Sequence, residues 1–147
     1  MKLRFSKHLL TVIAILLSTG AVLSGCCHAE TFVEKIPTNI PPRNGMQPVA
    51  VGKAYNSGYY LFNTWPIYTG DPVKFDRKDY HSFHDDIRPD RNANMLLRSM
   101  QKRFKAEKLV DVEHSTSSWG YFSLWIIWRK TISTSAVGVK HIKADKK

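Results

Sequence analysis

The stretch DRNANMLLRSMQKRFKAEKL, residues 90–109, decides the fold class because it has a clear helical period. Its apolar side chains recur at the spacing of one helix face; they are Ala93, Leu96, Leu97, Met100 and Phe104. The opposite face is basic and carries Arg91, Arg98, Lys102 and Lys105. Asp90 follows Pro89 and suits the N-cap position and the positive end of the helix dipole. The stretch therefore predicts an amphipathic helix with one face available for packing.

The sequence before this helix predicts one strand and a long loop. Residues 59–65, YYLFNTW, are rich in aromatic residues that favour a pleated, half-buried surface. Pro66 should end or interrupt that strand, and residues 68–72, YTGDP, have the composition of a turn. Residues 73–89 are polar and irregular, so we expect a long loop there.

The sequence after the helix predicts two or three further strands. Residues 109–113 alternate apolar and polar side chains, and the polar residues 115–118 predict a turn. Residues 121–129 are apolar on both alternating sets, which is typical of a strand covered on both faces or central in a sheet. Residues 131–139 are rich in β-branched side chains and suit a strand that pairs with it.

The order of these elements predicts an α+β fold. We expect a small antiparallel sheet of three to four strands, with the amphipathic helix packed on one face. An alternative places the helix on anionic lipid with its apolar side inserted. Packing on the sheet is favoured because the apolar faces of the strands need a cover. The aromatic side chains are expected in that core, rather than as stacking platforms for sugars or bases; they are Tyr59, Tyr60, Phe62, Trp65, Trp119, Tyr121, Trp125 and Trp128.

The N-terminus has the layout of a secretory signal. Lys2, Arg4 and Lys7 precede residues 9–23, a stretch of 15 residues without charge. A spanning helix needs about 20 apolar residues, so this stretch fits a cleaved signal better than a permanent span. Ordinary cleavage after Ala29 is the alternative to the processing described next, and it would release a soluble protein.

Leu23-Ser24-Gly25-Cys26 resembles the lipobox of bacterial lipoproteins. The resemblance implies cleavage between Gly25 and Cys26, a diacylglyceryl group on the Cys26 thiol, and acylation of the new α-amine. A thiolate is the nucleophile that accepts such a group. Two or three acyl chains anchor a protein far more firmly than a single chain does. The implied partner is a lipid bilayer, and the implied location is the bacterial cell envelope, with the outer membrane as the expected address.

Three regions follow from these features. Residues 1–25 are the signal peptide, residues 26–48 are the lipidated N-terminus with a proline-rich tether, and residues 49–147 form a small α+β domain with a basic C-terminal tail. The tether is inferred from its turn-forming and extended residues; they are Pro37, Asn39, Pro41, Pro42, Asn44, Gly45 and Pro48. Cys27 would remain as a single thiol, so no disulfide within the domain is expected.

The charge of the mature chain favours anionic partners. Removal of residues 1–25 leaves 19 Lys and Arg against 12 Asp and Glu, a net charge of +7. An anionic envelope polymer or a protein partner fits this charge. Nucleic acid is not expected, because export removes the usual nucleic-acid partners.

A histidine and aspartate cluster is the main candidate for chemistry. Imidazole and carboxylate groups together can hold a divalent ion, and they gather here as Asp79, His81, His84, Asp85 and Asp86. His81, His84 and Asp85 are the candidate metal ligands. The spacing matches no fixed ligand motif, and polar loops often concentrate such residues for solubility alone, so we predict no metal and no cofactor. We then expect His81→Ala with His84→Ala to leave stability nearly unchanged.

These observations favour a membrane-anchored lipoprotein whose domain is a non-enzymatic binding or interaction module. The sequence contains neither a Gly-x-Ser-x-Gly elbow nor a phosphate loop, so no catalytic residue is predicted. Residues 59–72 are similar to segments of small uncharacterised envelope lipoproteins, a resemblance that implies no activity. The alternative is a membrane-tethered hydrolase or metal-dependent enzyme that uses His81, His84 and Asp85. Anionic-surface contact would fall to Arg91, Arg98, Lys102 and Lys105.

Overall fold

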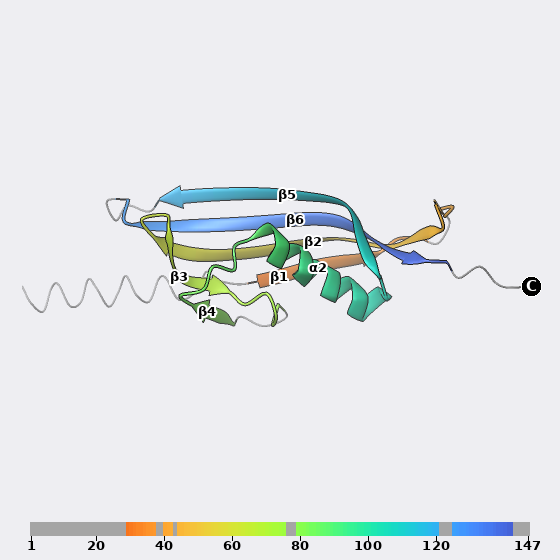
Figure 1. Cartoon of the computed structure of the whole chain (residues 1–147), viewed down its shortest axis with the longest axis horizontal. Coiled ribbons are helices and arrows are strands. Elements are labelled where there is room, and N and C mark those ends of the chain that lie inside the picture. Colours follow the sequence, from red (N-terminus) through yellow and green to blue (C-terminus); the bar gives the residue numbers. More distant parts are fainter. Residues whose placement is uncertain (1–28, 38–39, 43, 76–78, 121–124, 143–147) are drawn as a thin grey trace, which may run out of the picture.

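A computed structural model describes residues 29–37, 40–42, 44–75, 79–120 and 125–142. The described part is a long antiparallel sheet with one helix against it (Figure 1). The elements in chain order are β1 (Ala29–Lys35), β2 (Met46–Leu61), β3 (Trp65–Gly70), β4 (Tyr80–Ser82), α2 (Pro89–Phe104), β5 (Lys108–Gly120) and β6 (Ile127–His141). Within these residues no helix is long and apolar enough to cross a bilayer.

The sheet has six strands in the order β4-β3-β2-β6-β5, with β1 also paired to β2. The long strand β2 pairs with β6 along its whole length, from Met46↔His141 to Leu61↔Ile127. Its other edge is shared: β1 pairs with residues 50–56 and β3 with residues 58–61. The α+β class holds, but the predicted three to four strands were wrong. Three segments have a different structure from the predicted one, each for a physical reason.

The first segment is the predicted tether, part of which is strand β1. Ala29 pairs with Asn56 and Lys35 pairs with Ala50, so these residues belong to the sheet. The tether interpretation was therefore wrong for Ala29–Lys35, and the folded part begins well before Val49. Several of the prolines that predict a tether lie in the connection between β1 and β2. In β1 itself Thr31 and Val33 turn inward while Glu30 and Glu34 face solvent, a short alternation that favours a strand.

The second segment is the polar run at residues 115–118, predicted as a turn and found inside β5. Ser115, Thr116, Ser117 and Ser118 all pair with β6, and all four are exposed. A strand at the edge of a sheet that is open to solvent needs no apolar side chains, because backbone pairing holds it. Composition alone therefore misidentified it.

The third segment is residues 59–65, predicted as one strand and divided by a turn. The Thr64 amide donates to the Leu61 carbonyl at 3.0 Å, and Phe62 and Asn63 both have positive φ. These are features of the hairpin turns whose twist matches that of the strands. Pro66 and Tyr68 then lie in β3 rather than in a break or a turn. In the strand predicted over 121–129, residues 121–124 lie outside the described residues, and β6 begins at Ile127.

The helix is shorter than predicted, and the face that it buries is rotated about the helix axis relative to the predicted face. Its N-cap is Arg88 rather than Asp90, Pro89 occupies the first turn, and Lys105 ends it in the left-handed conformation at φ 55°. The residues that the sheet buries are Asn92, Met95, Leu96, Ser99 and Met100. Ala93, Leu97 and Phe104, which were predicted on the core face, are only half-buried.

Two polar residues explain this rotation. Asn92 Nδ2 donates to the Ala54 carbonyl at 3.1 Å and to Thr134 Oγ1 at 2.8 Å, and Ser99 Oγ accepts from Thr31 Oγ1 at 2.9 Å. Hydrogen bonds offset the cost of burying a polar side chain; for Asn92 they are made by the amide nitrogen, while its buried Oδ1 has no partner in the described part of the chain. An argument from apolar spacing leaves such residues out of the core face.

Small residues in the sheet let the helix approach closely. Ala50 and Ala54 of β2 and Ala136 of β6 are buried beneath α2. A Cβ added to Gly138 would lie 2.8 Å from the Met100 sulfur. Since interiors are close-packed, these positions accept little extra volume.

Candidate functional site

The candidate cluster from the sequence forms around the His81 ring. His81 is in β4 and pairs with Thr69 of β3. Its Nε2 lies 3.1 Å from Asp71 Oδ2, and its Nδ1 lies 2.5 Å from Asp86 Oδ2. Each ring nitrogen therefore faces a carboxylate oxygen, and neither is left to bind a metal or take a proton from a substrate.

Arg91 completes the network from the first turns of α2. Its NH1 lies 2.6 Å from Asp86 Oδ1, so both oxygens of the Asp86 carboxylate are paired. Asp86 is fully buried, and a buried carboxylate needs such partners. Asp71, also buried, accepts from the Val73 amide at 2.8 Å. We call Asp71, His81, Asp86 and Arg91 the His81 network; it joins the end of β3, strand β4 and the helix.

Further hydrogen bonds fasten the same loop to the sheet. Asn56 Nδ2 donates to the Gly70 carbonyl at 2.9 Å and to the Asp86 carbonyl at 3.3 Å. Thr69 Oγ1 donates to the His84 carbonyl at 3.0 Å. The long loop before the helix is thus held by side chains of β2 and β3. Sequence reasoning missed Asn56 and Thr69, which lie within strands, and Asp71, which follows β3, because no local pattern marks their contacts.

The remaining metal candidates have other partners. Asp85 Oδ1 accepts from the Tyr60 hydroxyl at 2.5 Å, and His84 Nδ1 lies 2.9 Å from the Ser82 carbonyl. The His81 and His84 rings are near each other, with centroids 5.5 Å apart, but their bonded nitrogens serve different groups. Among the residues that the structure describes, no three His, Cys, Asp or Glu side chains converge as a metal site requires.

Burial and the loop before α2 together raise the pKa of the Tyr60 hydroxyl. Burial raises the pKa of the Tyr60 hydroxyl, and the hydrogen bond to the Asp85 carboxylate raises that pKa further. The hydroxyl therefore stays protonated and acts as a donor. The Lys130 ammonium lies 4.3 Å from the centroid of the Tyr60 ring, a cation–π arrangement.

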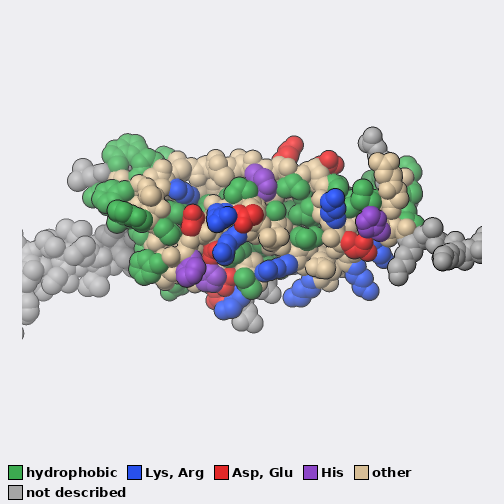
Figure 2. All heavy atoms as spheres, viewed as in Figure 1, with side chains coloured by type: hydrophobic (Ala, Val, Ile, Leu, Met, Phe, Trp, Pro, Cys, Tyr) green, Lys and Arg blue, Asp and Glu red, His purple; other side chains and the backbone are tan. Residues whose placement is uncertain are grey.

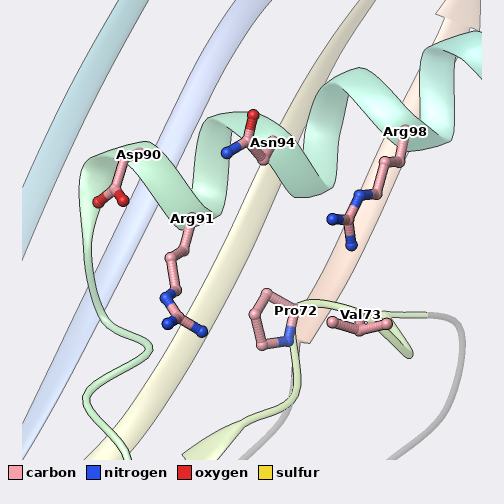
Figure 3. A pocket seen from close by; sticks show the side chains of 6 residues that line it. All are labelled: Pro72, Val73, Asp90, Arg91, Asn94 and Arg98. Carbon is pink, nitrogen blue, oxygen red and sulfur yellow. The ribbon is translucent and has the colours of Figure 1, made fainter.

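One of the four basic residues predicted on the helix belongs to the His81 network, and the other three lie at the surface. Arg91 is bound to Asp86, whereas Arg98, Lys102 and Lys105 are exposed. Arg91 and Arg98 extend toward the loop that carries Pro72 and Val73 (Figure 3). Between them lies a pocket of about 190 Å³ that Asp90 and Asn94 also line. It is small and carries both signs of charge, so it offers no selective anion site.

A larger hollow lies beside the C-terminal end of α2. It has a volume of about 450 Å³ and is lined by Lys35, Ile36, Gln47, Pro48, Val49, Arg103, Phe104 and Lys105. Three of these side chains are cationic, and within the described ranges none of the three forms an ion pair. Lys35 and Arg103 were not singled out from the sequence, because their meeting depends on β1 lying in the sheet under the helix.

Four of the eight aromatic residues predicted for the core are instead exposed. Tyr59 and Tyr60 are buried, but Phe62, Trp65, Trp119 and Trp125 are more than half exposed. Tyr121 lies outside the described residues, as does Cys26, the predicted lipidation site. The assignment of all these rings to the core was therefore wrong for four of them.

Comparison with known proteins assigns no family. No family model matches the chain, and neither the curated proteins nor the solved structures include a match.

Proposed function

We propose that this chain is a lipoprotein of the bacterial cell envelope, anchored through acylated Cys26, with a domain that binds a partner and performs no catalysis. The observation that carries the proposal is Leu23-Ser24-Gly25-Cys26 directly after an uncharged stretch of 15 residues. The outer membrane is the proposed address.

The start of the fold makes this proposal more specific. Strand β1 begins at Ala29, so only Cys27 and His28 separate the proposed lipid attachment site from the sheet. A lipid on Cys26 would then hold the domain close to the headgroups, not at the end of a long tether. Binding at the membrane surface suits such a short connection.

The His81 network supports a binding module over an enzyme. A general base or metal ligand needs a ring nitrogen that is free to act. Both nitrogens of His81 face aspartates, and Asp85 is held by Tyr60. The hydrolase alternative depends on His81, His84 and Asp85; because His81 and Asp85 are already bound to other side chains, it would have to rely on His84.

An anionic partner fits the charged hollow as well as the net charge. Lys35, Arg103 and Lys105 surround apolar side chains in the 450 Å³ depression. Cations without internal partners attract acidic groups and remain available to them. We propose an acidic envelope polymer or an acidic protein segment as the partner class.

Metabolic labelling with fatty acid tests the anchor. The full chain should incorporate label in a bacterial host with lipoprotein processing, Cys27→Ser should incorporate it equally, and Cys26→Ser should incorporate none. Cys27→Ser is the matched control because it removes the neighbouring thiol. Equal labelling of Cys26→Ser and wild type would overturn the lipoprotein proposal.

A further inference from the structure

All four tryptophans of the chain lie at one end of the sheet. Trp65 opens β3, Trp119 is near the end of β5, and Trp125 and Trp128 lie just before and within β6. The exposed fractions are 63% for Trp65, 64% for Trp119 and 66% for Trp125. With Phe62 and Ile126 they form an exposed apolar end that we call the aromatic tip: Phe62, Trp65, Trp119, Trp125 and Ile126. Figure 2 shows hydrophobic side chains gathered at this end of the molecule.

The tip is one surface because its two turns are bonded to each other. The Phe62 amide of the β2–β3 turn donates to the Ile126 carbonyl at 2.7 Å. Ser118 Oγ of β5 donates to Asn63 Oδ1 at 3.0 Å. The Phe62 and Trp65 rings meet edge to face with centroids 6.2 Å apart. These contacts hold the β2–β3 turn against Ile126 and against the end of β5.

The backbone at the tip is unfavourable for the residues it carries. Phe62 has φ 49° and Trp125 has φ 62°, a left-handed conformation that suits Asn or Gly far better than a bulky aromatic residue. Both side chains are also exposed, at 55% and 66%. Neither feature stabilises the fold in water, and strained positions of this kind are often retained for function.

The charge of the tip favours a lipid surface. Residues 57–70 and 115–128 contain no charged side chain, and the next two residues of β6, Arg129 and Lys130, are half-buried, with the Lys130 ammonium over the Tyr60 ring. An uncharged surface rich in tryptophan is the composition found where proteins meet the headgroup layer of a bilayer. A large exposed apolar patch is a mark of such a contact.

The path of the chain places the proposed anchor at the same end. Because β1 is antiparallel to β2, Ala29 is the end of β1 nearer the tip, opposite Asn56. Asn56 and Leu61 are five residue steps apart along β2, about 17 Å of strand. Cys26 and Ala29 are three steps apart and can be separated by at most about 11 Å. Even a fully extended connection would therefore leave Cys26 about 6 Å short of the end of β2. This offset is within the depth of about 5–10 Å at which apolar surfaces enter the interface.

We propose that the aromatic tip inserts into the interface of the membrane that holds the lipid on Cys26. This inference rests on the proposed lipoprotein function for the choice of membrane. The tip gives the domain a fixed orientation on the bilayer, with the sheet standing away from the surface. The helix and its charged hollow then remain accessible to a partner.

Tryptophan emission can test this directly, because every tryptophan lies at the tip end. The mature full chain is placed in vesicles of phosphatidylcholine and phosphatidylglycerol, with bromine on the phosphatidylcholine acyl chains either near the carbonyl or near the methyl end. We expect emission shifted to shorter wavelength and quenched more strongly by bromine near the carbonyl. Emission unaffected by either brominated lipid would overturn the proposal, as would emission that changes only with protein concentration, which would place a second copy on the tip.

Variants at the strained positions keep the fold while removing the apolar contact. Phe62→Asn with Trp125→Asn should retain the thermal midpoint, since Asn tolerates the left-handed conformation, and should reduce quenching of the remaining tryptophans. Ile40→Asn, at an exposed residue in the connection at the opposite end of β2, should leave quenching unchanged. Equal quenching of the double variant and wild type would contradict tip insertion.

The mass of the same sample separates the two proposals. Lipidated protein with unquenched tryptophans would overturn the tip proposal and leave the anchor standing. Unlipidated protein whose tryptophans are quenched by added vesicles would support the tip and overturn the anchor.

Discussion

The Nδ1 nitrogen of His81 lies 2.5 Å from the Oδ2 oxygen of Asp86, a carboxylate that is fully buried. This pair shows what the histidine and aspartate residues do in the described fold. They fasten the segment before α2 to the sheet, through Asp71 on one side of the ring and Arg91 beyond Asp86. The cluster that resembled a reactive site in the sequence has a structural role.

His81→Ala should therefore destabilise the protein, contrary to the expectation from the sequence. The change leaves two buried carboxylates short of a partner, which typically costs about 1–3 kcal/mol. The side chain of His81 is 36% exposed, so water can replace part of the lost interaction and values above this range are not expected. His84→Ala, at an exposed ring, should change the free energy of unfolding by less than about 0.5 kcal/mol. Denaturant melts measure both, and equal effects of the two variants would contradict the network.

Coupling within the network can be measured with a double-mutant cycle. His81→Ala and Asp86→Asn, alone and together, should show an interaction free energy of about 0.5–3 kcal/mol, as contacting residues of one network do. The control cycle pairs His81→Ala with Lys102→Ala on the exposed side of α2. Additive effects in the first cycle would show that the two side chains do not act together.

Truncations along the helix should follow the rotated face. Leu96→Ala and Met100→Ala remove fully buried side chains and should cost about 2–5 kcal/mol each. Leu97→Ala, at a half-buried residue, should cost clearly less, and Lys102→Ala should stay within about 0.5 kcal/mol of wild type. Thermal or denaturant unfolding gives the order. A larger loss for Leu97→Ala than for Leu96→Ala would favour the face predicted from apolar spacing.

The close approach of α2 to the sheet predicts a size compensation. Gly138→Ala adds a Cβ that would lie 2.8 Å from the Met100 sulfur, and overpacking of this kind typically costs about 1–3 kcal/mol. A Met100→Ala background removes the sulfur contact and leaves the Ala106 Cβ at 3.0 Å, so the same change should cost less. Unfolding free energies of the four proteins test this, and an unchanged cost in the second background would show that Met100 is not the obstacle.

Stability should fall at alkaline pH through Tyr60. Its pKa is raised in the folded state, whereas an unfolded tyrosine titrates near pH 10. Above about pH 10 the unfolded chain loses this proton while the folded protein keeps it, so unfolding becomes more favourable by up to about 1.4 kcal/mol per pH unit. Below pH 10 the contribution is fully present. Tyr60→Phe should show a shallower decline of the unfolding free energy between pH 10 and 11, and an identical slope in both proteins would contradict the assignment.

Strands pair with segments distant in the sequence, and this limits how much of the fold the sequence could predict. The α2 helix was predicted because Leu96 and Met100 repeat within a few residues, a signal that is local. Strand β5 was divided because Ser115–Ser118 is polar, and its pairing with β6 is not visible in composition. Strand β1 was assigned to a tether because its partner Ala50–Asn56 lies beyond a proline-rich connection. Strand register and buried polar partners such as Asn92 depend on contacts distant in sequence.

The candidate site shows the same division. The sequence indicates a cluster of His81, His84, Asp85 and Asp86 because these residues are neighbours in the chain. Asp71 directly follows β3 and Arg91 lies in α2; these residues determine what His81 does and were not connected to it from the sequence. The aromatic tip was likewise hidden, because Trp65 and Trp119 come to the same end of the sheet only when the strands between them are paired.

The intact mass of the purified mature protein tests the central proposal most directly. Expressed as the full chain in a bacterial host, it should have the mass of the polypeptide from Cys26 to Lys147 plus a diacylglyceryl group and one amide-linked acyl chain. Digestion should place the whole added mass on the N-terminal peptide that contains Cys26 and Cys27. A mature protein that begins at Glu30, or one that retains residues 1–25, with no lipid mass would contradict the lipoprotein account.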